Sequence, residues 1–269
     1  MDKRIEDNIK TGIVILHYIN EDLTKACIQS IRENTSKDSY HIYVVDNFSP
    51  VQLFPRMLQD KDLSILRNDC RHSTSGMNFG FYHALYESGR NHDYIVNLDN
   101  DTLVQPGWLD ALVNEMESHP NTGICGGKQW DKEGANYYSV GSDLSGYIYN
   151  SWPTERTEVH WLQGSFHMYR AKMMRMIGLQ DTRYQDYCSD SDYCIHALDR
   201  GWDVVFVPES NITHFGGTSY KEYPVERADD LGAMKAKWFG TKFNSLANVL
   251  PIDSQERIHG QIIYKESRR

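Results

Sequence analysis

The sequence predicts an α/β fold in which helices flank a mainly parallel central sheet. Short β-rich segments alternate with single helical segments through the first half of the chain, and carboxylates directly follow two of these β-rich segments. Strands separated by single helices favour right-handed crossovers, which make neighbouring strands parallel. Ligands of such sheets bind beyond the carboxyl ends of the strands, so we expect a site there.

The strands and helices of the first half follow one another in a regular order. Asn20, with two acids directly after it, predicts the start of a first helix. A second helix is expected over residues 76–89, and Pro106 opens a third at a position where proline is tolerated. The expected strands occupy residues 12–18, 41–47, 63–68, 93–101 and 123–127.

The second half of the chain predicts a different arrangement. Residues 135–170 are rich in Tyr, Ser, Gly and Trp and contain alternating stretches, which predicts a small antiparallel sheet. A helix over Ala171 to Ile177, an acidic turn and helix over 184–201, and a strand over 202–208 should follow. A helical pattern with basic residues then covers residues 222–248.

This organisation predicts one large domain and an extension. The domain should span residues 1–220, with halves at about 11–127 and 128–220, and a helical extension should cover residues 221–269. There is no internal repeat or low-complexity tract.

Composition limits the classes of partner and the compartment. The formal net charge of −9 argues against a nucleic-acid partner, which usually requires a basic surface. No apolar run approaches the roughly 20 residues that cross a bilayer, and the first ten residues lack the apolar core of a signal peptide. Five cysteines without a CxxC pair suggest no disulfide framework. We therefore expect a cytoplasmic protein.

Two carboxylates one residue apart, Asp99 and Asp101, end the apolar run that starts at Tyr94. Close carboxylates repel each other unless a cation or a proton offsets their charge. Asp46 ends another predicted strand, so parallel pairing would bring all three carboxylates to one edge of the sheet. The pattern indicates a divalent metal site, and a merely polar strand-to-helix turn is the alternative.

Five segments together resemble a known family. They read "VILHYINEDLTKACIQSI", "IYVVDNFS", "GMNFGF", "NLDNDTLVQPGWL" and "DYCSDSDYCIHALDRGWDVVFVPESNITHFGGTS". In this order and spacing they resemble family 2 glycosyltransferases with the GT-A fold, close to the rhamnosyltransferase-like members. The resemblance covers residues 11–220. It implies a Rossmann-like sheet and transfer of a sugar from a nucleotide-sugar donor, with UDP- or dTDP-sugars favoured.

The resemblance also implies a metal set. Asp101 would bind Mn²⁺ or Mg²⁺ directly, and Asp99 would lie nearer the ribose or a metal-bound water. Asn100, between them, would lie at the nucleotide. His214 would complete the metal shell or touch the diphosphate.

Further residues would hold the nucleotide by the same resemblance. Asp46 would read the nucleobase, although an Asx turn that closes the strand is an alternative. The backbone around His17 and Tyr18 would line the pocket. Asn78 and Gly80 would lie near the diphosphate, with helix packing as an equally open interpretation.

Asp190 aligns with the family's catalytic base, which takes the proton of the acceptor hydroxyl during attack on the anomeric carbon. Asp192 would support this base or contact the acceptor. The chain departs from the family pattern at Ser189, where a glutamate is usual.

The acceptor side would include Trp161, Gln163 and Gly164, although Trp161 could belong to the core. The processive signature Q-x-x-R-W is absent, and the corresponding segment reads "HALDRGW". The missing signature implies transfer of one sugar. The family resemblance implies inversion at the anomeric carbon, a glycan or lipid-linked acceptor, and a place in bacterial surface-polysaccharide assembly.

Two other function classes stay open. A nucleotidyltransferase would show a Gly-rich basic loop near the first strand, which "ILHYINED" lacks. A non-catalytic module that binds nucleotide or glycan would act as a scaffold. The helix around residues 233–243, with Lys235, Lys237 and Lys242, could dock peripherally on the inner face of a membrane or form a homodimer seam.

Overall fold

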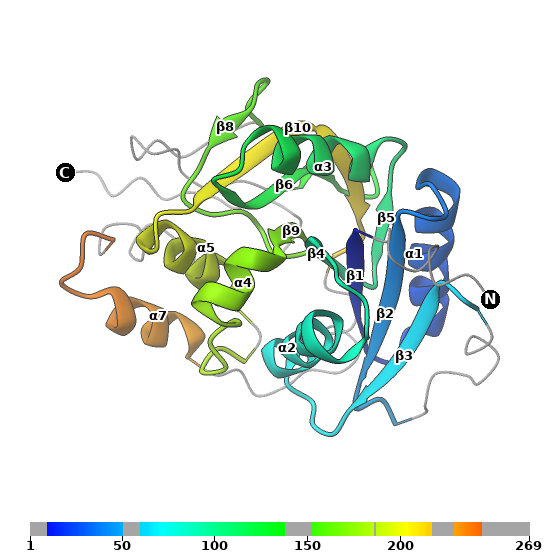
Figure 1. Cartoon of the computed structure of the whole chain (residues 1–269). Coiled ribbons are helices and arrows are strands. Elements are labelled where there is room, and N and C mark those ends of the chain that lie inside the picture. Colours follow the sequence, from blue (N-terminus) through cyan, green and yellow to red (C-terminus); the bar gives the residue numbers. More distant parts are fainter. Residues whose placement is uncertain (1–9, 51–59, 138–151, 186, 217–228, 244–269) are drawn as a thin grey trace.

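A computed structural model describes residues 10–50, 60–137, 152–185, 187–216 and 229–243 (Figure 1). Its strands are β1 (Thr11–His17), β2 (Tyr40–Asn47), β3 (Leu63–Asn68), β4 (Tyr94–Asp99), β5 (Thr102–Val104), β6 (Thr122–Trp130), β7 (Asn136–Tyr137), β8 (Thr157–Glu158), β9 (Phe166–Arg170) and β10 (Asp203–His214). Its helices are α1 (Glu21–Asn34), α2 (Ser73–Tyr82), the π-helical turn η3 (His83–Glu87), α3 (Trp108–Ser118), α4 (Ala171–Ile177), α5 (Ser189–Asp199) and α7 (Asp230–Trp238).

All described strands join one sheet, in the order β3-β2-β1-β4-β9-β6-β10-β5, with β7 beside β6 and β8 beside β10. The neighbours β3, β2, β1 and β4 are parallel, as the alternation of strands and helices predicts. In this register His17 lies opposite Asp46, and Leu16 lies opposite Asp99. The prediction that Asp46 and Asp99 reach the same edge of the sheet is therefore confirmed.

The antiparallel strands expected in the second half are present, but they extend the main sheet rather than form a separate one. β9 lies between β4 and β6 and is antiparallel to both, with Leu98 opposite Phe166 and Cys125 opposite Met168. Phe166 and Met168 are completely buried, because both faces of the sheet are covered at this point. β9 therefore connects the two halves of the domain through backbone hydrogen bonds.

Helices cover both faces of the sheet (Figure 1). Alternate residues of β1 face opposite sides: Ile13 and Ile15 pack with side chains of α1 and α3, and Val14 packs with those of α2, α4 and α5. Each face thus has its own apolar core, which is why the strands read as continuous apolar runs. In the part of the chain that the structure describes, no helix is long and apolar enough to span a bilayer.

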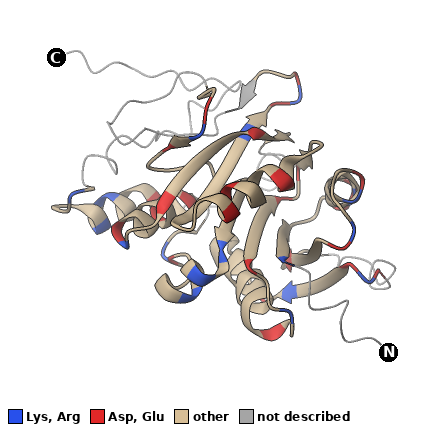
Figure 2. Ribbon diagram, turned by 45° about the horizontal axis from the view of Figure 1, so that its top comes forward, with Lys and Arg blue, Asp and Glu red and all other residues tan. Residues whose placement is uncertain are grey.

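Several helix boundaries differ from the prediction. α3 begins at Trp108 rather than at Pro106, because Gly107 between them has a left-handed backbone with φ +78°. α2 begins at Ser73 rather than at residue 76, because the His72 side chain accepts a hydrogen bond from Ser75 N and caps the helix. Of the helical pattern predicted over 222–248, α7 is present over Asp230–Trp238, but the prediction is wrong for residues 239–243, which form turns with Gly240 at φ +74°. Residues 217–228 and 244–269 lie outside the described ranges, as do 138–151 of the predicted antiparallel region. Figure 2 shows Lys and Arg interspersed with Asp and Glu across the described elements.

Two histidines are buried in the parallel strands. His17 and His41 are only 1% and 2% exposed. Burial lowers the pKa of each imidazole to about 4. Both rings are therefore neutral in the folded chain at pH 7, and protonating them would place a charge in the interior.

We expect the free energy of unfolding to fall as the pH is lowered from 7 to 5. The unfolded chain takes up these protons near pH 6.5 and the folded chain only near 4, so stability is lost through this window, by about 1–2 kcal/mol for each histidine. Urea denaturation at pH 7, 6 and 5 measures the effect, and a His41→Gln variant should show a shallower decrease. An equally steep decrease in that variant would contradict this explanation.

Candidate active site

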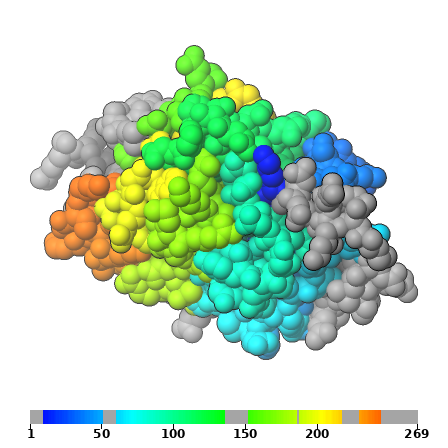
Figure 3. Space-filling model, viewed as in Figure 1, coloured from blue at the N-terminus to red at the C-terminus, as the bar shows by residue number. Residues whose placement is uncertain are grey.

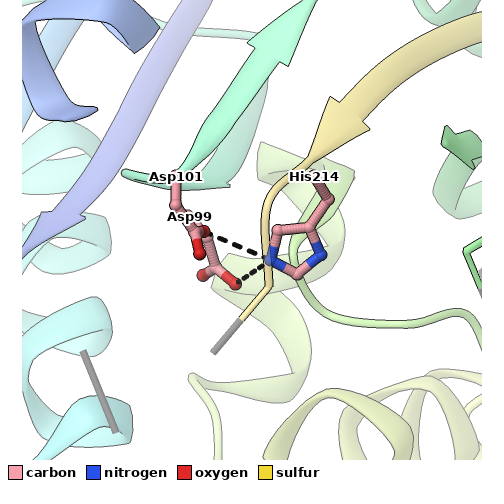
Figure 4. Close-up of side chains that lie close together, drawn as sticks. All are labelled: Asp99, Asp101 and His214. Atoms are coloured by element: carbon pink, nitrogen blue, oxygen red, sulfur yellow. Dashed lines mark ion pairs between the residues drawn. The ribbon is translucent and has the colours of Figure 1, made fainter. Parts of the chain in front are cut away.

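Asp99, Asp101 and His214 form a cluster at the edge of the sheet (Figure 4). His214 Nε2 lies 3.2 Å from Asp101 Oδ1 and 3.7 Å from Asp99 Oδ2. One ligand atom of each residue lies within 4.8 Å of the other two. The structure therefore brings together the three residues predicted as a metal set, although His214 lies more than 100 residues from Asp99 and Asp101 in the chain.

Short backbone contacts hold this cluster in place. β4 ends at Asp99, and β5 starts at Thr102, directly opposite His214 in the antiparallel pair with β10. Phe215 N donates to Asp101 O at 3.0 Å just beyond that pair. The turn that contains the two carboxylates is thus hydrogen-bonded to the end of β10, which carries the His214 imidazole.

Ser165 orients the cluster from behind. Its hydroxyl lies 3.1 Å from His214 Nδ1, and its carbonyl accepts a hydrogen bond from Asp99 N at 3.1 Å. Because Nδ1 is occupied by Ser165, the other ring nitrogen faces the carboxylates. Histidines that bind metals usually hold their second nitrogen in this way. The sequence gives no signal for Ser165, because its contacts come from the pairing of β9 with β4.

The electrostatics of the cluster favour a cation. Loss of water around the Asp99 carboxylate raises its pKa to about 6, and the charges of Asp101 and Asp190 add to this effect. His214 opposes it. A divalent cation would offset this repulsion. The two carboxylates suit Mn²⁺ or Mg²⁺, which prefer oxygen ligands and keep positions open for phosphate, and the imidazole would add one nitrogen ligand. Asp99 is half-exposed, so its carboxylate is accessible to such an ion.

Asp190 lies close enough to this cluster for its charge to act on Asp99. It is the second residue of α5, and its Oδ2 accepts a hydrogen bond from Gly164 N at 2.7 Å. Its Oδ1 accepts from Ser191 N, also at 2.7 Å. Asn97 Nδ2 donates to Gly164 O, which fixes the same peptide segment to β4. Asp190 therefore has a defined position beside the predicted metal ligands.

Segment 163–165 connects Asp190 to the Asp–His cluster. Gly164 contacts Asp190, and the next residue, Ser165, contacts both His214 and Asp99. The close approach requires glycine: a Cβ built on Gly164 would lie 2.6 Å from Asp190 Cβ and 2.7 Å from its Oδ2. Gly164 was predicted on the acceptor side, and the structure adds a direct hydrogen bond to the predicted base.

The predicted nucleobase residue, Asp46, is buried and already hydrogen-bonded. Its Oδ2 pairs with Arg67 Nη1, and its Oδ1 accepts from Ser49 N at 2.9 Å. The Asp46 side chain thus closes the turn after the strand, but through the N–H three residues on rather than the one two residues on that an Asx turn uses. The ring of Tyr18 lies 4.2 Å from the Arg71 guanidinium carbon. Both arginines, at the carboxyl end of β3 and after it, were missed by the sequence analysis.

Two residues that the resemblance places at the nucleotide, His17 and Asn100, have side-chain partners within the protein. His17 Nδ1 lies 2.7 Å from Thr24 Oγ1, and Asn100 Nδ2 donates to the same hydroxyl at 3.0 Å. Both side chains therefore tie β1 and the Asp99–Asp101 turn to α1. The predictions that the backbone around His17 lines the nucleotide pocket and that Asn100 lies at the nucleotide stay predictions.

Asn78 and Gly80 have packing roles in α2. The Asn78 side chain donates to Gln180 O and accepts from Gln180 N, at 2.8 and 3.1 Å. A Cβ at Gly80 would lie 2.4 Å from Val14 Cγ1 and 2.7 Å from Val45 Cγ2, so glycine is needed for close packing of α2 on the sheet. The structure favours the helix-packing interpretation for both residues.

The comparison with known families identifies the fold and the family. The sequence model of glycosyl transferase family 2 matches residues 12–178, more than half of the chain. The chain belongs to glycosyl transferase family 2. The N-acetylglucosaminyl-diphospho-decaprenol L-rhamnosyltransferase of two Mycobacterium tuberculosis strains is 29% identical over 143 residues, 45% of this chain and 47% of that protein. The chain thus spans about half the length of these curated relatives.

Solved structures show the same fold. S. aureus TarS 1–349 in complex with UDP-GlcNAc superposes with a TM-score of 0.66 at 12% identity, covering 89% of this chain and 69% of that one. GalNAc-T7 with UDP, GalNAc and Mn²⁺ gives a TM-score of 0.64 at 15% identity, covering 84% and 47%. The GT-A fold expected from the sequence is therefore confirmed for this family 2 member.

Within this glycosyl transferase family 2 chain, Asp192 is an internal contact. It is 1% exposed, and its carboxylate accepts hydrogen bonds from Tyr184, Lys237 and Trp238. These bonds favour the supporting role over contact with an acceptor. The other two residues predicted on the acceptor side also have internal contacts: Trp161 packs at the junction of two apolar clusters, and Gln163 O accepts from Gln129 Nε2.

We expect Gly164→Ala to lower the rate of sugar transfer by at least about 10-fold, because the new methyl group displaces Asp190 from its hydrogen bond. Gly12→Ala is the matched control, since its Cβ would lie 3.0 Å from the His92 ring at the opposite end of β1. Initial rates of both variants, with thermal melting to confirm folding, measure the effect. Equal rates in the parent and in Gly164→Ala would contradict the assigned geometry.

Proposed function

We propose that this chain is a metal-dependent, inverting glycosyltransferase that moves one sugar from a nucleotide-sugar donor to a glycan or lipid-linked acceptor. The observation that carries the proposal is the Asp99, Asp101 and His214 cluster, held next to Asp190 by segment 163–165. Donor activation and acceptor activation both need charged groups at fixed positions. Segment 163–165 fixes the Asp99, Asp101 and His214 cluster relative to Asp190.

Asp101 and His214, with Asp99 beside them, would hold Mn²⁺ or Mg²⁺. Such an ion acts as a Lewis acid that neutralises charge on the diphosphate leaving group. Ser165 supports this role, because its hydroxyl fixes His214 with Nε2 toward the carboxylates. The Mn²⁺ bound in the GalNAc-T7 structure agrees with this assignment at the level of the fold.

The nucleotide would lie over the carboxyl ends of β1 and β2. The Asp46–Arg67 pair and the Tyr18–Arg71 stack both lie at this edge and offer hydrogen-bonding and aromatic groups. The donor class we propose is a UDP- or dTDP-sugar. UDP accompanies both GalNAc-T7 and, as UDP-GlcNAc, TarS in their solved structures.

Asp190 would act as the base. As the acceptor oxygen attacks the anomeric carbon, the bond from that carbon to the diphosphate oxygen breaks, and the acceptor proton passes to the Asp190 carboxylate. One direct displacement of this kind inverts the anomeric centre. Gly164 N–H keeps the carboxylate in position through its bond to Oδ2.

The acceptor class is proposed from the mycobacterial relative, whose name specifies a lipid-diphosphate-linked sugar. A place in bacterial surface-polysaccharide assembly follows from the same relative, with the protein in the cytoplasm or peripheral at the inner membrane face. Contact of residues 233–243 with a membrane, or with a second copy, stays a prediction. Met234 and Trp238 are buried within the chain itself, so these two side chains would not form that contact.

Metal-dependent donor binding is tested by thermal shift with UDP-GlcNAc, dTDP-L-rhamnose and GDP-mannose, each with Mn²⁺ or EDTA. A ligand at 100 times its dissociation constant adds about 2.7 kcal/mol of stability. We expect a shift only with Mn²⁺, its loss in Asp101→Ala, and about 10–100-fold weaker Mn²⁺ affinity in Ser165→Ala. Shifts that persist in EDTA would refute metal dependence, and no shift with any sugar nucleotide would favour the scaffold alternative.

The base is tested by Asp190→Asn, which keeps the side-chain shape and removes the proton acceptor. We expect the rate of transfer, or of donor hydrolysis with water as the acceptor, to fall by about 10²–10⁴-fold. The Mn²⁺-dependent thermal shift with donor should stay unchanged, because Asp190 is not among the proposed metal ligands. A variant with parental rate would exclude Asp190 as the base.

A further inference from the structure

α7 contacts the segment that leads into α5 through a buried carboxylate. Asp230, the first residue of α7, is 3% exposed. Its Oδ1 accepts a hydrogen bond from Gln185 N at 3.0 Å, and its Oδ2 accepts one from Tyr187 N at 2.8 Å. Both oxygens of one side chain thus bind backbone N–H groups that lie three to five residues before Asp190.

A second buried carboxylate fixes α5 itself against α7. Asp192 Oδ1 accepts from Tyr184 OH at 2.9 Å and from Trp238 Nε1 at 2.7 Å. Its Oδ2 accepts from Lys237 Nζ at 2.6 Å. Two positions along a helix correspond to a rotation of about 200°, so Asp190 and Asp192 point to nearly opposite sides of α5. Asp190 therefore meets Gly164 on one side while Asp192 meets α7 on the other.

An apolar cluster completes this contact. Tyr184 and Ile195 pack with Met234, Trp238 and Phe243 in a small core separate from the two cores of the sheet. Figure 3 shows α7, in orange, lying directly against the yellow-green residues of α5 at the surface of the molecule. The segment before α5 is also held on its other side, since Gln185 O accepts from Thr74 N of α2 at 3.4 Å.

The start of α5 needs such external contacts, because the residue before it has an unfavourable backbone conformation. Cys188, the residue before the helix, has φ +64° without being glycine, and it provides no side-chain cap. A left-handed conformation costs a non-glycine residue roughly 1–2 kcal/mol, and it persists where surrounding contacts determine it. The bonds from Asp230 on one side of Cys188 and from Asp192 on the other supply such contacts.

We propose that α7 sets the position of the Asp190 carboxylate, with Asp230 and Asp192 as positioning residues. The catalytic significance of this placement rests on the proposed function, in which Asp190 is the base. A displacement of about 1 Å at a reacting group can cost on the order of 100-fold in rate. The C-terminal extension is thereby part of the catalytic apparatus, although none of its described residues lies in the Asp–His cluster.

The test uses Asp230→Asn in the full chain, with Asp229→Asn as the matched control. Asparagine at 230 keeps the shape but turns one acceptor oxygen into an NH₂ group, which cannot accept from a backbone N–H. Asp229 accepts from Gly232 N at 2.9 Å and caps α7, a role that asparagine also performs well. The two variants thus remove the same charge from adjacent positions, and only one loses a bond to the segment before α5.

The first readout is hydrogen exchange at the Gly164 amide, which donates to Asp190 rather than to Asp230. It needs no substrate. We expect exchange at least 10-fold faster in Asp230→Asn, with the amides of β1 and β4 unchanged and with Asp229→Asn like the parent. Equal exchange at Gly164 in all three proteins would overturn the proposal, and so would faster exchange throughout the sheet, which would show a general loss of stability.

The second readout separates positioning from donor binding. For hydrolysis or transfer with the sugar nucleotide that binds best, Asp230→Asn should lower kcat at least 10-fold and leave the donor KM and the Mn²⁺ affinity within twofold. An unchanged kcat, in a protein whose Asp190→Asn variant is inactive, would overturn this inference alone. An Asp190→Asn variant with parental activity would instead refute the base assignment and, with it, the catalytic role of α7.

Discussion

Carboxylates brought together at one edge of the sheet, where they lose part of their water, set the constraint on which the site depends. This loss of water is the main cause that raises the pKa of Asp99, and the charges of Asp101 and Asp190 add to it. Such an arrangement is unfavourable unless each group is held in place and a cation or proton offsets the charge. The contacts around the three residues are therefore best understood as the means by which this fold keeps like charges together.

Backbone groups provide most of that restraint. Segment 163–165 contacts Asp190 through Gly164 N and Asp99 through Ser165 O, while the Ser165 hydroxyl fixes His214. This segment leads directly into β9, the strand that pairs with both β4 and β6. Because β4 and β6 hold β9 on both sides, a small displacement in the segment would alter the proposed metal ligands and the proposed base at the same time.

The sequence predicts the parts of this arrangement that depend on local pattern. Alternating strands and helices predict the parallel sheet, and carboxylates at strand ends predict a metal site at Asp99 and Asp101, while the part of His214 in that site is implied by the family resemblance. Contacts between distant residues have no such signal: the bond from Asn97 to Gly164 spans 67 positions, and the one from Asp192 to Trp238 spans 46. For the same reason the insertion of β9 and the internal partners of Asn78 could not be predicted.

The central claim is that one short segment places a metal ion and a base side by side. Anomalous diffraction at the manganese edge, from crystals grown with Mn²⁺ and UDP, tests it most directly. The account predicts a single strong peak within bonding distance of Asp101 and His214 Nε2, with the Asp190 carboxylate still hydrogen-bonded to Gly164 N. A peak elsewhere, or an ordered nucleotide with no manganese at this cluster, would contradict it.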